Sequence, residues 1–213
     1  MNFFTTLSRI KQGKDSKKSI SATYQDVRYQ LIPLTIQSID DTEIISLLTA
    51  WRKKHEFWFP AQFRVTVPGT RVWLAERVLN VPDRILFMIR VGGTYIGHVG
   101  LFRYDKEDNT IEIDNIVRGE PDYPGIMTHA LTTLMTWGKT SLGLVDYRLQ
   151  TASDNDRALR LYTRLGFRET KRTPMLHVKT PGGWQWEDAP MGYKGKITRY
   201  NVWMKRFDVK EVL

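Results

Sequence analysis

The chain contains no cysteine among its 213 residues, which excludes disulfide bonds, thiolate metal sites and a cysteine nucleophile. It also lacks any apolar run approaching the roughly 20 residues that a membrane-spanning helix needs. The four histidines, at positions 55, 98, 129 and 177, do not have the spacing of a zinc site. No P-loop and no Gly-x-Ser-x-Gly motif is present. We therefore expect no metal, no transmembrane segment and a reducing, cytoplasmic location.

The charge is unbalanced toward the positive, with 32 Lys and Arg against 23 Asp and Glu and a formal net charge of +9. A basic surface favours phosphorylated or otherwise negative ligands. Nucleic acid is the competing interpretation of the same charge. The basic residues are dispersed and no nucleic-acid-binding motif occurs, so we expect no nucleic-acid partner.

Residues 1–24 differ from the rest and are predicted to be a basic N-terminal arm, either solvated or forming a short docking helix. A membrane-surface segment is the alternative, whereas the order of charged and apolar residues does not fit a secretory signal. The apolar residues that could share a helix face and the basic residues beside them are Phe3, Phe4, Leu7, Ile10, Arg9, Lys11, Lys14, Lys17 and Lys18. Residues 25–213 are predicted to be a single domain, interrupted by an inserted flap at about 172–198, in which 175–179 and 184–187 are expected to pair as a hairpin across residues 180–183.

The stretch from Ile111 to Phe167 has the pattern strand, turn, helix, strand, helix. Strands are predicted at 111–117 and 147–152, and helices at 126 to about 139 and at 154–165. Upstream, an antiparallel meander is predicted over 84–91, 95–104 and 110–117, with Gly92-Gly93 as a hairpin turn. Such units build sheets that are partly parallel and carry helices on their faces. The fold class is therefore α/β (α+β).

The turn from Arg118 to Gly125 leads into the first of these two helices. Amide groups at a helix start favour a negative partner, and Gly125 lets a ligand approach the backbone closely. A phosphate or pyrophosphate would fit there. An ordinary strand-to-helix turn explains the same residues.

The second helix carries the more specific motif, Ser-Asp-Asn-x-x-Ala-x-x-x-Tyr-x-x-x-Gly-Phe, from Ser153 to Phe167. Ser153 and Asp156 have the spacing of an approximate capping box, and Gly166 suits a left-handed helix end. This motif resembles the last motif of the GCN5-related N-acetyltransferase (GNAT) superfamily, over about residues 27–171. The family's acyl-CoA loop is less well matched: at residues 122–127 only Gly125 agrees.

The resemblance implies a GNAT-like mixed central sheet of about six to seven strands with helices on both faces. It implies an N-acetyltransferase that uses acetyl-CoA. Asn155 would then hold the coenzyme arm and Tyr162 would act as general acid near the sulfur, although either residue could be purely structural. The backbone positions that would meet the pantetheine arm and the pyrophosphate are Asn115, Ile116, Val117, Gly125, Ile126 and Met127.

The general base is left among three candidates. Glu112 and Asp114 alternate along one strand and so share a face. His98 lies on the neighbouring strand and has an imidazole suited to proton transfer. Glu112 and His98 are preferred, with Asp114 next.

The acceptor is expected to be a small-molecule amine. The run from Ile113 to Glu120 is similar to members that acetylate nucleotide-linked amino sugars in surface-glycan synthesis, and the aromatic group at 57–59 could line a pocket for a flat or sugar ring. A protein N-terminus or lysine, a polyamine, and a non-catalytic binding module with the same fold are the alternatives. The flap at 172–198 would cover the acceptor site or make an oligomer contact, with a homodimer as one possibility.

Overall fold

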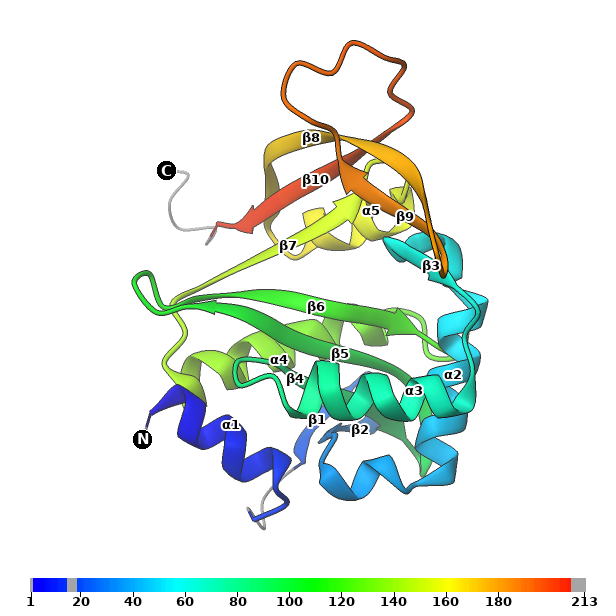
Figure 1. Cartoon of the computed structure of the whole chain (residues 1–213). Helices are drawn as coiled ribbons and strands as arrows, with labels where there is room; N and C mark the ends of the chain where they lie inside the picture. The colour runs from blue at the N-terminus through cyan, green and yellow to red at the C-terminus, as the bar shows by residue number, and fades with distance from the viewer. Residues whose placement is uncertain (1, 15–18, 208–213) are drawn as a thin grey trace. The chain divides into compact units, whose positions relative to one another are not determined.

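The computed structural model describes residues 2–14 and 19–207, and the chain divides into two compact units (Figure 1). The first unit comprises Met1–Trp51 and Thr66–Tyr147. The second unit comprises Arg52–Val65 and Arg148–Leu213. Each unit contains its own antiparallel strands.

The first unit is built on five strands in the order β1-β2-β4-β5-β6, in which each neighbouring pair is antiparallel. These strands are β1 (Ile20–Tyr24), β2 (Val27–Pro33), β4 (Ile85–Val91), β5 (Thr94–Asp105) and β6 (Thr110–Arg118). The helical elements are α1 (Phe3–Lys11), η1 (Ile36–Ile39), α2 (Thr42–Lys54, of which 42–51 lie in this unit), α3 (Val67–Trp73), the π-helical η3 (Leu74–Leu79) and α4 (Ile126–Leu142).

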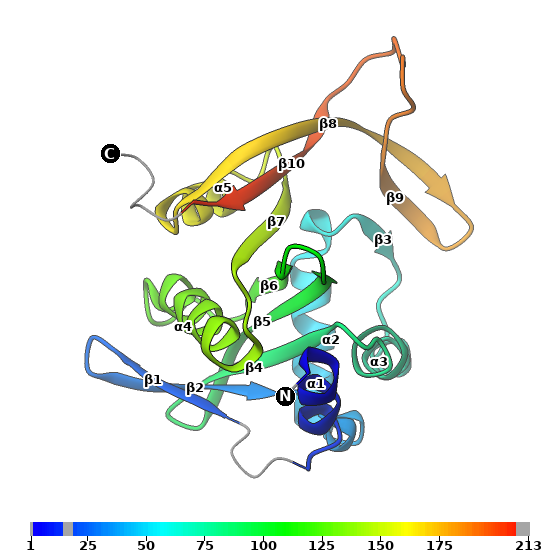
Figure 2. The same cartoon turned by 90° about the vertical axis from the view of Figure 1, so that its left-hand side faces the viewer.

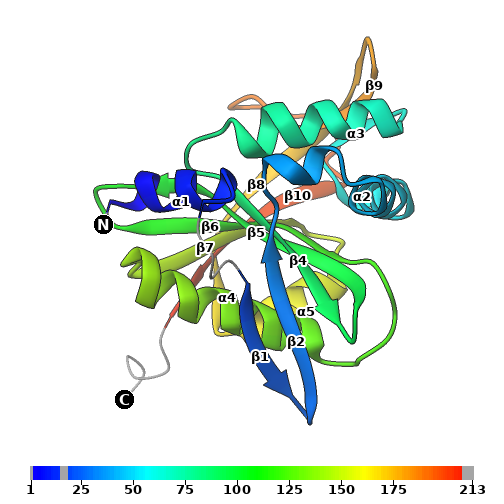
Figure 3. The same ribbon diagram turned by 90° about the horizontal axis from the view of Figure 1, so that it is seen from below.

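Both faces of this sheet are covered. Helix α4 lies on one face and helices α2 and α3 lie on the other (Figures 2 and 3). Strand β4 is accordingly buried along almost its whole length, and the Phe87 ring packs edge-on against Trp137 of α4. A strand buried on both faces needs a continuous apolar run, which Ile85–Ile89 supplies. The expectation of helices on both faces is confirmed for this unit.

The second unit has the strand order β7-β10-β8-β9-β3. Its strands are β3 (Ala61–Phe63), β7 (Asp146–Ala152, whose first two residues fall in the first unit), β8 (Phe167–Thr180), β9 (Gly183–Asp188) and β10 (Arg199–Arg206), and its helical elements are η2 (Glu56–Trp58) and α5 (Asp156–Arg164). The predicted hairpin between 175–179 and 184–187 is confirmed, with Met175 opposite Asp188 and Thr180 opposite Gly183.

The predicted strand number was too low, because ten strands form within residues 2–14 and 19–207 instead of six or seven. Strand β1 was assigned to the N-terminal arm because the basic character of residues 1–24 favoured an arm, although Ile20–Tyr24 alternates apolar and polar residues; it pairs with the adjacent β2 across a short turn. Strand β3 has only three residues and is defined by its pairing with β9. Pairing between segments distant in the sequence leaves no local pattern, so a single sequence does not reveal such strands.

The N-terminal residues 3–11 form α1, in which Phe3, Leu7 and Ile10 are buried. The Phe3 ring stacks on Tyr104 with centroids 3.9 Å apart. Lys17 and Lys18 of the predicted basic arm lie outside the described residues. The predicted domain boundaries stay predictions. Within the described ranges, no helix combines the length and the apolar character required to cross a membrane.

Candidate active site

Strand β6 carries a bulge at the centre of the first unit. Val117 pairs with His98 and Asp114 pairs with Gly100, so two residues of β6 lie opposite one residue of β5. Asn115 absorbs the extra length in a left-handed conformation, with φ 49°. Bulges redirect backbone groups and side chains, and they are frequent beside active sites.

The bulge turns the Asn115 carbonyl toward His98, whose Nδ1 lies 2.7 Å from that oxygen. A carbonyl oxygen only accepts hydrogen bonds, so Nδ1 carries a proton and Nε2 is the ring nitrogen that could take up another. His98 is 4% exposed, and its ring centroid lies 6.1 Å from that of Trp51. The fold thus fixes the tautomer that a general base requires.

The two carboxylates predicted beside His98 are held in ion pairs. Glu112 accepts a hydrogen bond from Arg103 at 2.8 Å. Asp114 accepts from Arg84 at 2.5 Å and from the Asn115 side-chain amide at 2.8 Å. Guanidinium donors thus engage both carboxylates, whereas Nδ1 of His98 lies beside a backbone carbonyl.

The loop after β6 is held in place by Arg118, the last residue of that strand. The Arg118 guanidinium donates to the carbonyls of Glu120, at 3.1 Å, of Pro121, and of Asp122, at 3.1 Å. The amides of Gly119 and Glu120 both donate to the carbonyl of Ile96, at 2.9 and 3.1 Å. These hydrogen bonds therefore hold the backbone between β6 and α4 in a defined conformation.

Trp51 of α2 fixes the same loop from the helix side. Its indole Nε1 donates to Glu120 Oε1 at 2.9 Å, and the side chain is 2% exposed. A Cβ placed on Gly119 would lie 2.0 Å from a carbon of the Trp51 ring. Only glycine fits beside this indole.

The start of α4 has the glycine that the sequence pattern requires. Gly125 is the N-cap, with φ 87°, and a Cβ there would lie 2.2 Å from the hydroxyl oxygen of Tyr24. The side chains of Ile126 and Met127 are buried at 0% and 7% exposure, so only their backbones can face a ligand. The Ile126 amide already donates to the carbonyl of Tyr123 at 3.2 Å, which leaves the amides of Gly125 and Met127 as the better candidates.

In the second unit, Asn155 is the N-cap of α5, and its Oδ1 accepts from the Ala158 amide at 3.2 Å. The predicted capping box from Ser153 was wrong, because Ser153 Oγ accepts instead from the Tyr200 amide of β10 at 3.0 Å. Tertiary pairing took the serine hydroxyl away from the helix start. The Oδ1 of Asn155 is therefore engaged within the helix, and its Nδ2 is the end suited to a ligand.

Tyr162 lies on the buried face of α5, 6% exposed, with its ring edge-on to Phe167 at 6.3 Å. Burial raises the pKa of its hydroxyl, because removal from water penalises the phenolate. The hydroxyl therefore remains protonated at neutral pH, as a proton donor must.

Arg199 was not predicted, yet it ties the turn before α5 to the aromatic stretch at 57–59. Its guanidinium contacts Asp154 Oδ2 through Nη2 at 2.7 Å and Nε at 3.2 Å. The same group lies between the rings of Phe57 and Trp186, 4.5 Å from each centroid. The aromatic stretch itself is not core, since Phe57 is 54% and Trp58 42% exposed.

The predicted residues thus fall into two groups. The first unit brings His98 and Asn115 into contact and carries the two carboxylates and the α4 start, whereas Asn155 and Tyr162 belong to the second unit. The sequence had no signal for Arg118, Trp51 or Arg199, since each acts through a fold-dependent contact. No group of three or more His, Cys, Asp or Glu side chains able to hold a metal occurs in the part of the chain that the structure describes.

Comparison with known proteins identifies the family of this chain. Residues 30–168 match the family model described as an acetyltransferase (GNAT) domain. Among curated proteins, the chain is 32% identical over 87 residues to the mouse (Mus musculus) alpha/beta-tubulin-N-acetyltransferase 9, which covers 40% of this chain. The chain's match spans about a third of the length of that relative, 36%.

Solved structures agree on the fold. A GCN5-related N-acetyltransferase from Brucella melitensis has a TM-score of 0.64 at 21% identity, covering 90% of this chain and 79% of that one. The Vibrio cholerae spermidine N-acetyltransferase, in complex with CoA and spermine, has a TM-score of 0.62 at 13% identity, covering 83% of this chain and 94% of that one.

Proposed function

The chain belongs to the GNAT family of N-acetyltransferases, and from this membership we propose that it transfers an acetyl group from acetyl-CoA to an amine nitrogen. The observation that carries the proposal is the bulge of β6, which fixes His98 with its proton on Nδ1. His98 Nε2 then takes a proton from the acceptor ammonium. The free amine attacks the thioester carbonyl, and the nitrogen of the tetrahedral intermediate releases its second proton to solvent. The C–S bond then breaks, and the CoA sulfur leaves as the thiolate, which receives a proton from Tyr162.

Coenzyme contacts are proposed for each unit by itself. In the first unit, the edge of β6 at Ile116 and Val117 would meet the pantetheine arm, and the backbone at the start of α4 would meet the pyrophosphate. In the second unit, Asn155 would hold the arm through Nδ2, and Tyr162 would protonate the leaving sulfur. The proposed role of Tyr162 rests on its place in the motif, and its hydroxyl carries a proton at working pH because burial raises its pKa.

The acceptor is proposed to be an amine with negative charge nearby, because the net charge of +9 favours anionic molecules. A nucleotide-linked amino sugar satisfies this and is one candidate. An acidic protein N-terminus satisfies it as well, and the name of the mouse relative, a tubulin N-acetyltransferase, supports a protein acceptor. A free polyamine is cationic and fits this charge least well.

A thermal-shift titration with acetyl-CoA tests the coenzyme claim. Saturable stabilisation is expected, since a ligand that binds only the native state raises its stability with concentration. Desulfo-CoA and adenosine are matched controls for the sulfur end and for the nucleotide. Absence of any shift would favour the alternative that the chain is a non-catalytic binding module.

The catalytic claim is tested by release of free CoA thiol with a panel of amines that includes nucleotide-linked amino sugars, acidic and neutral peptides, and spermidine. His98→Gln is expected to lower kcat by roughly 100-fold or more, the usual contribution of a general base, with acetyl-CoA binding unchanged. His55→Gln is the control, since His55 has no proposed catalytic role. Equal activity of both variants would remove His98 from the mechanism.

A further inference from the structure

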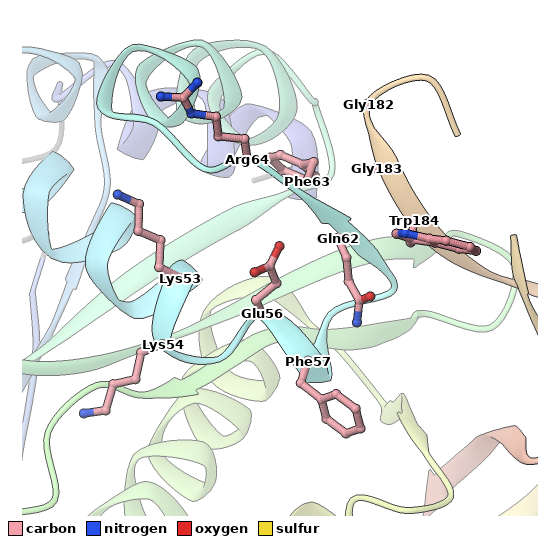
Figure 4. Close-up of a pocket in the computed structure, with 10 residues that line it drawn as sticks. All are labelled: Lys53, Lys54, Glu56, Phe57, Gln62, Phe63, Arg64, Gly182, Gly183 and Trp184. Atoms are coloured by element: carbon pink, nitrogen blue, oxygen red, sulfur yellow. The ribbon is translucent and has the colours of Figure 1, made fainter. Parts of the chain in front are cut away.

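A basic groove lies on the second unit, with a volume of about 580 Å³ (Figure 4). It is formed by the end of α2, the η2 turn, β3 and the tip of the β8–β9 hairpin. Its cationic side chains are Lys53, Lys54 and Arg64, and its one carboxylate is Glu56. The excess of positive charge favours an anionic ligand.

Three large aromatic side chains stand exposed in the same groove. Phe57 is 54% exposed, and Phe63 and Trp184 are each 45% exposed. Exposed aromatic rings beside arginine and lysine are typical of surfaces that bind another chain, because flat rings supply contact area at a low entropy cost.

The rings are held in place before any ligand arrives. His177 stacks between Trp184 and Trp186, with centroids 4.8 and 4.6 Å apart, and its Nε2 lies 3.1 Å from Gln62 Oε1. The stack continues through Trp186 to Arg199 and Phe57. A preorganised surface loses little conformational entropy on binding.

The edge of the sheet favours a polypeptide as the occupant. Strand β3 is the last strand of this unit's sheet and pairs with β9, as far as the described residues extend; the Ala61 carbonyl accepts a hydrogen bond from Arg52, so the Phe63 end of the strand is the part suited to a further strand. A Cβ on Gly182 would meet no atom within 4 Å, so the hairpin tip is open. An extended segment can add its backbone to such an edge while its side chains reach neighbouring groups.

From these features we propose that the basic groove is a docking surface for an acidic, extended polypeptide segment. Its carboxylates pair with Lys53 and Arg64, and its apolar side chains contact Phe63 and Trp184. The binding requires no acetyl-CoA and no transfer reaction, so a failure of this proposal can be distinguished from a failure of the proposed catalysis.

Fluorescence anisotropy of a labelled peptide of alternating Glu and Tyr, measured with the full chain without acetyl-CoA, tests the proposal. Saturable binding is expected, at least roughly tenfold tighter than for the matched Gln and Tyr peptide, and weakened by salt. Equal binding of the two peptides would overturn the proposal. If the acidic peptide binds only weakly and a nucleotide sugar displaces it from the groove, the groove is a nucleotide site and the proposal is wrong.

Paired charge reversals place the peptide in the groove. Lys53→Glu combined with Arg64→Glu is expected to weaken binding by roughly tenfold or more. The matched control is Lys106→Glu with Lys196→Glu, which changes the net charge equally at exposed positions outside the groove. Trp184→Ala should weaken binding of both peptides. Equal loss in the two double variants would show that only net charge matters and would refute the docking site.

Discussion

The Arg199 contact gives a quantitative prediction for the second unit. Its side chain is 4% exposed, whereas that of its partner Asp154 is 42% exposed. Asp154→Ala therefore leaves a buried cation without this partner, while Arg199→Met leaves a carboxylate that water can reach. Removing Asp154 and removing Arg199 should therefore lower the free energy of unfolding by different amounts.

The size of the effect follows from burial. Removing one partner of a buried ion pair costs about 3–5 kcal/mol. Partial solvation of Asp154 lowers this, and we expect about 2–4 kcal/mol for Asp154→Ala. Arg199→Met loses the ion pair and two ring contacts of about 0.5–2 kcal/mol each, partly replaced by apolar packing of the methionine. We expect about 2 kcal/mol for that variant.

Urea denaturation and thermal melting measure these losses of stability. Each kcal/mol should lower the melting temperature by roughly 2–4 °C in a chain of this size. The control is Arg172→Met on β8, which breaks an ion pair to Glu169 of the same 2.7 Å length but with side chains 46% and 40% exposed. That variant should lose less than about 1 kcal/mol. If Arg172→Met and Asp154→Ala destabilise equally, burial does not set the cost and the reasoning fails.

Three further predictions concern the coenzyme side and the buried tyrosine. Gly119→Ala should destabilise the chain by about 3 kcal/mol or more, or displace Trp51, because the new methyl overlaps the indole; an unchanged urea midpoint and tryptophan emission would contradict this. Gly125→Ala should weaken acetyl-CoA binding, measured by calorimetry, for two reasons. A non-glycine residue in this left-handed conformation is strained by about 1–2 kcal/mol, and its Cβ clashes with Tyr24. Adding Tyr24→Ala to the same chain should remove the clash but not the strain, so it should restore binding only in part. Tyr162→Phe should lower kcat with little change in coenzyme affinity. Since burial raises the folded-state pKa of Tyr162, its contribution to stability is complete below the unfolded value of 10 and is lost as pH rises above it, so the phenylalanine variant should show a weaker alkaline loss of stability.

Local patterns were sufficient for the elements that carry their own signals. The apolar run of β4, the Gly92-Gly93 hairpin and the hairpin between β8 and β9 were all predicted and form as expected. Asp41 caps α2, its Oδ1 accepting from the Ile44 amide at 3.0 Å, which is an interaction between near neighbours in the sequence. These features depend on neighbours in the sequence.

The candidate site likewise combines features that the sequence predicts with features that only the fold determines. Asn155 and Tyr162 came from the motif, and Glu112 and Asp114 came from their alternation on one strand. The guanidinium partners of these two carboxylates were not predicted, because they come from positions that no spacing links to them. The bulge at Asn115 is likewise set by the register of β5 against β6. Register depends on how whole strands pack, so one strand's sequence does not fix it.

The sequence by itself determined the acetyltransferase motif, the glycine at the start of α4 and the basic character of the chain. Only the tertiary structure decided that His98 donates to Asn115, that Ser153 leaves the helix start for β10, and that Arg199 lies between two rings. The physical reason is that helix starts, turns and charge are properties of neighbouring residues, whereas these contacts join residues far apart in the chain and exist only once the strands have paired.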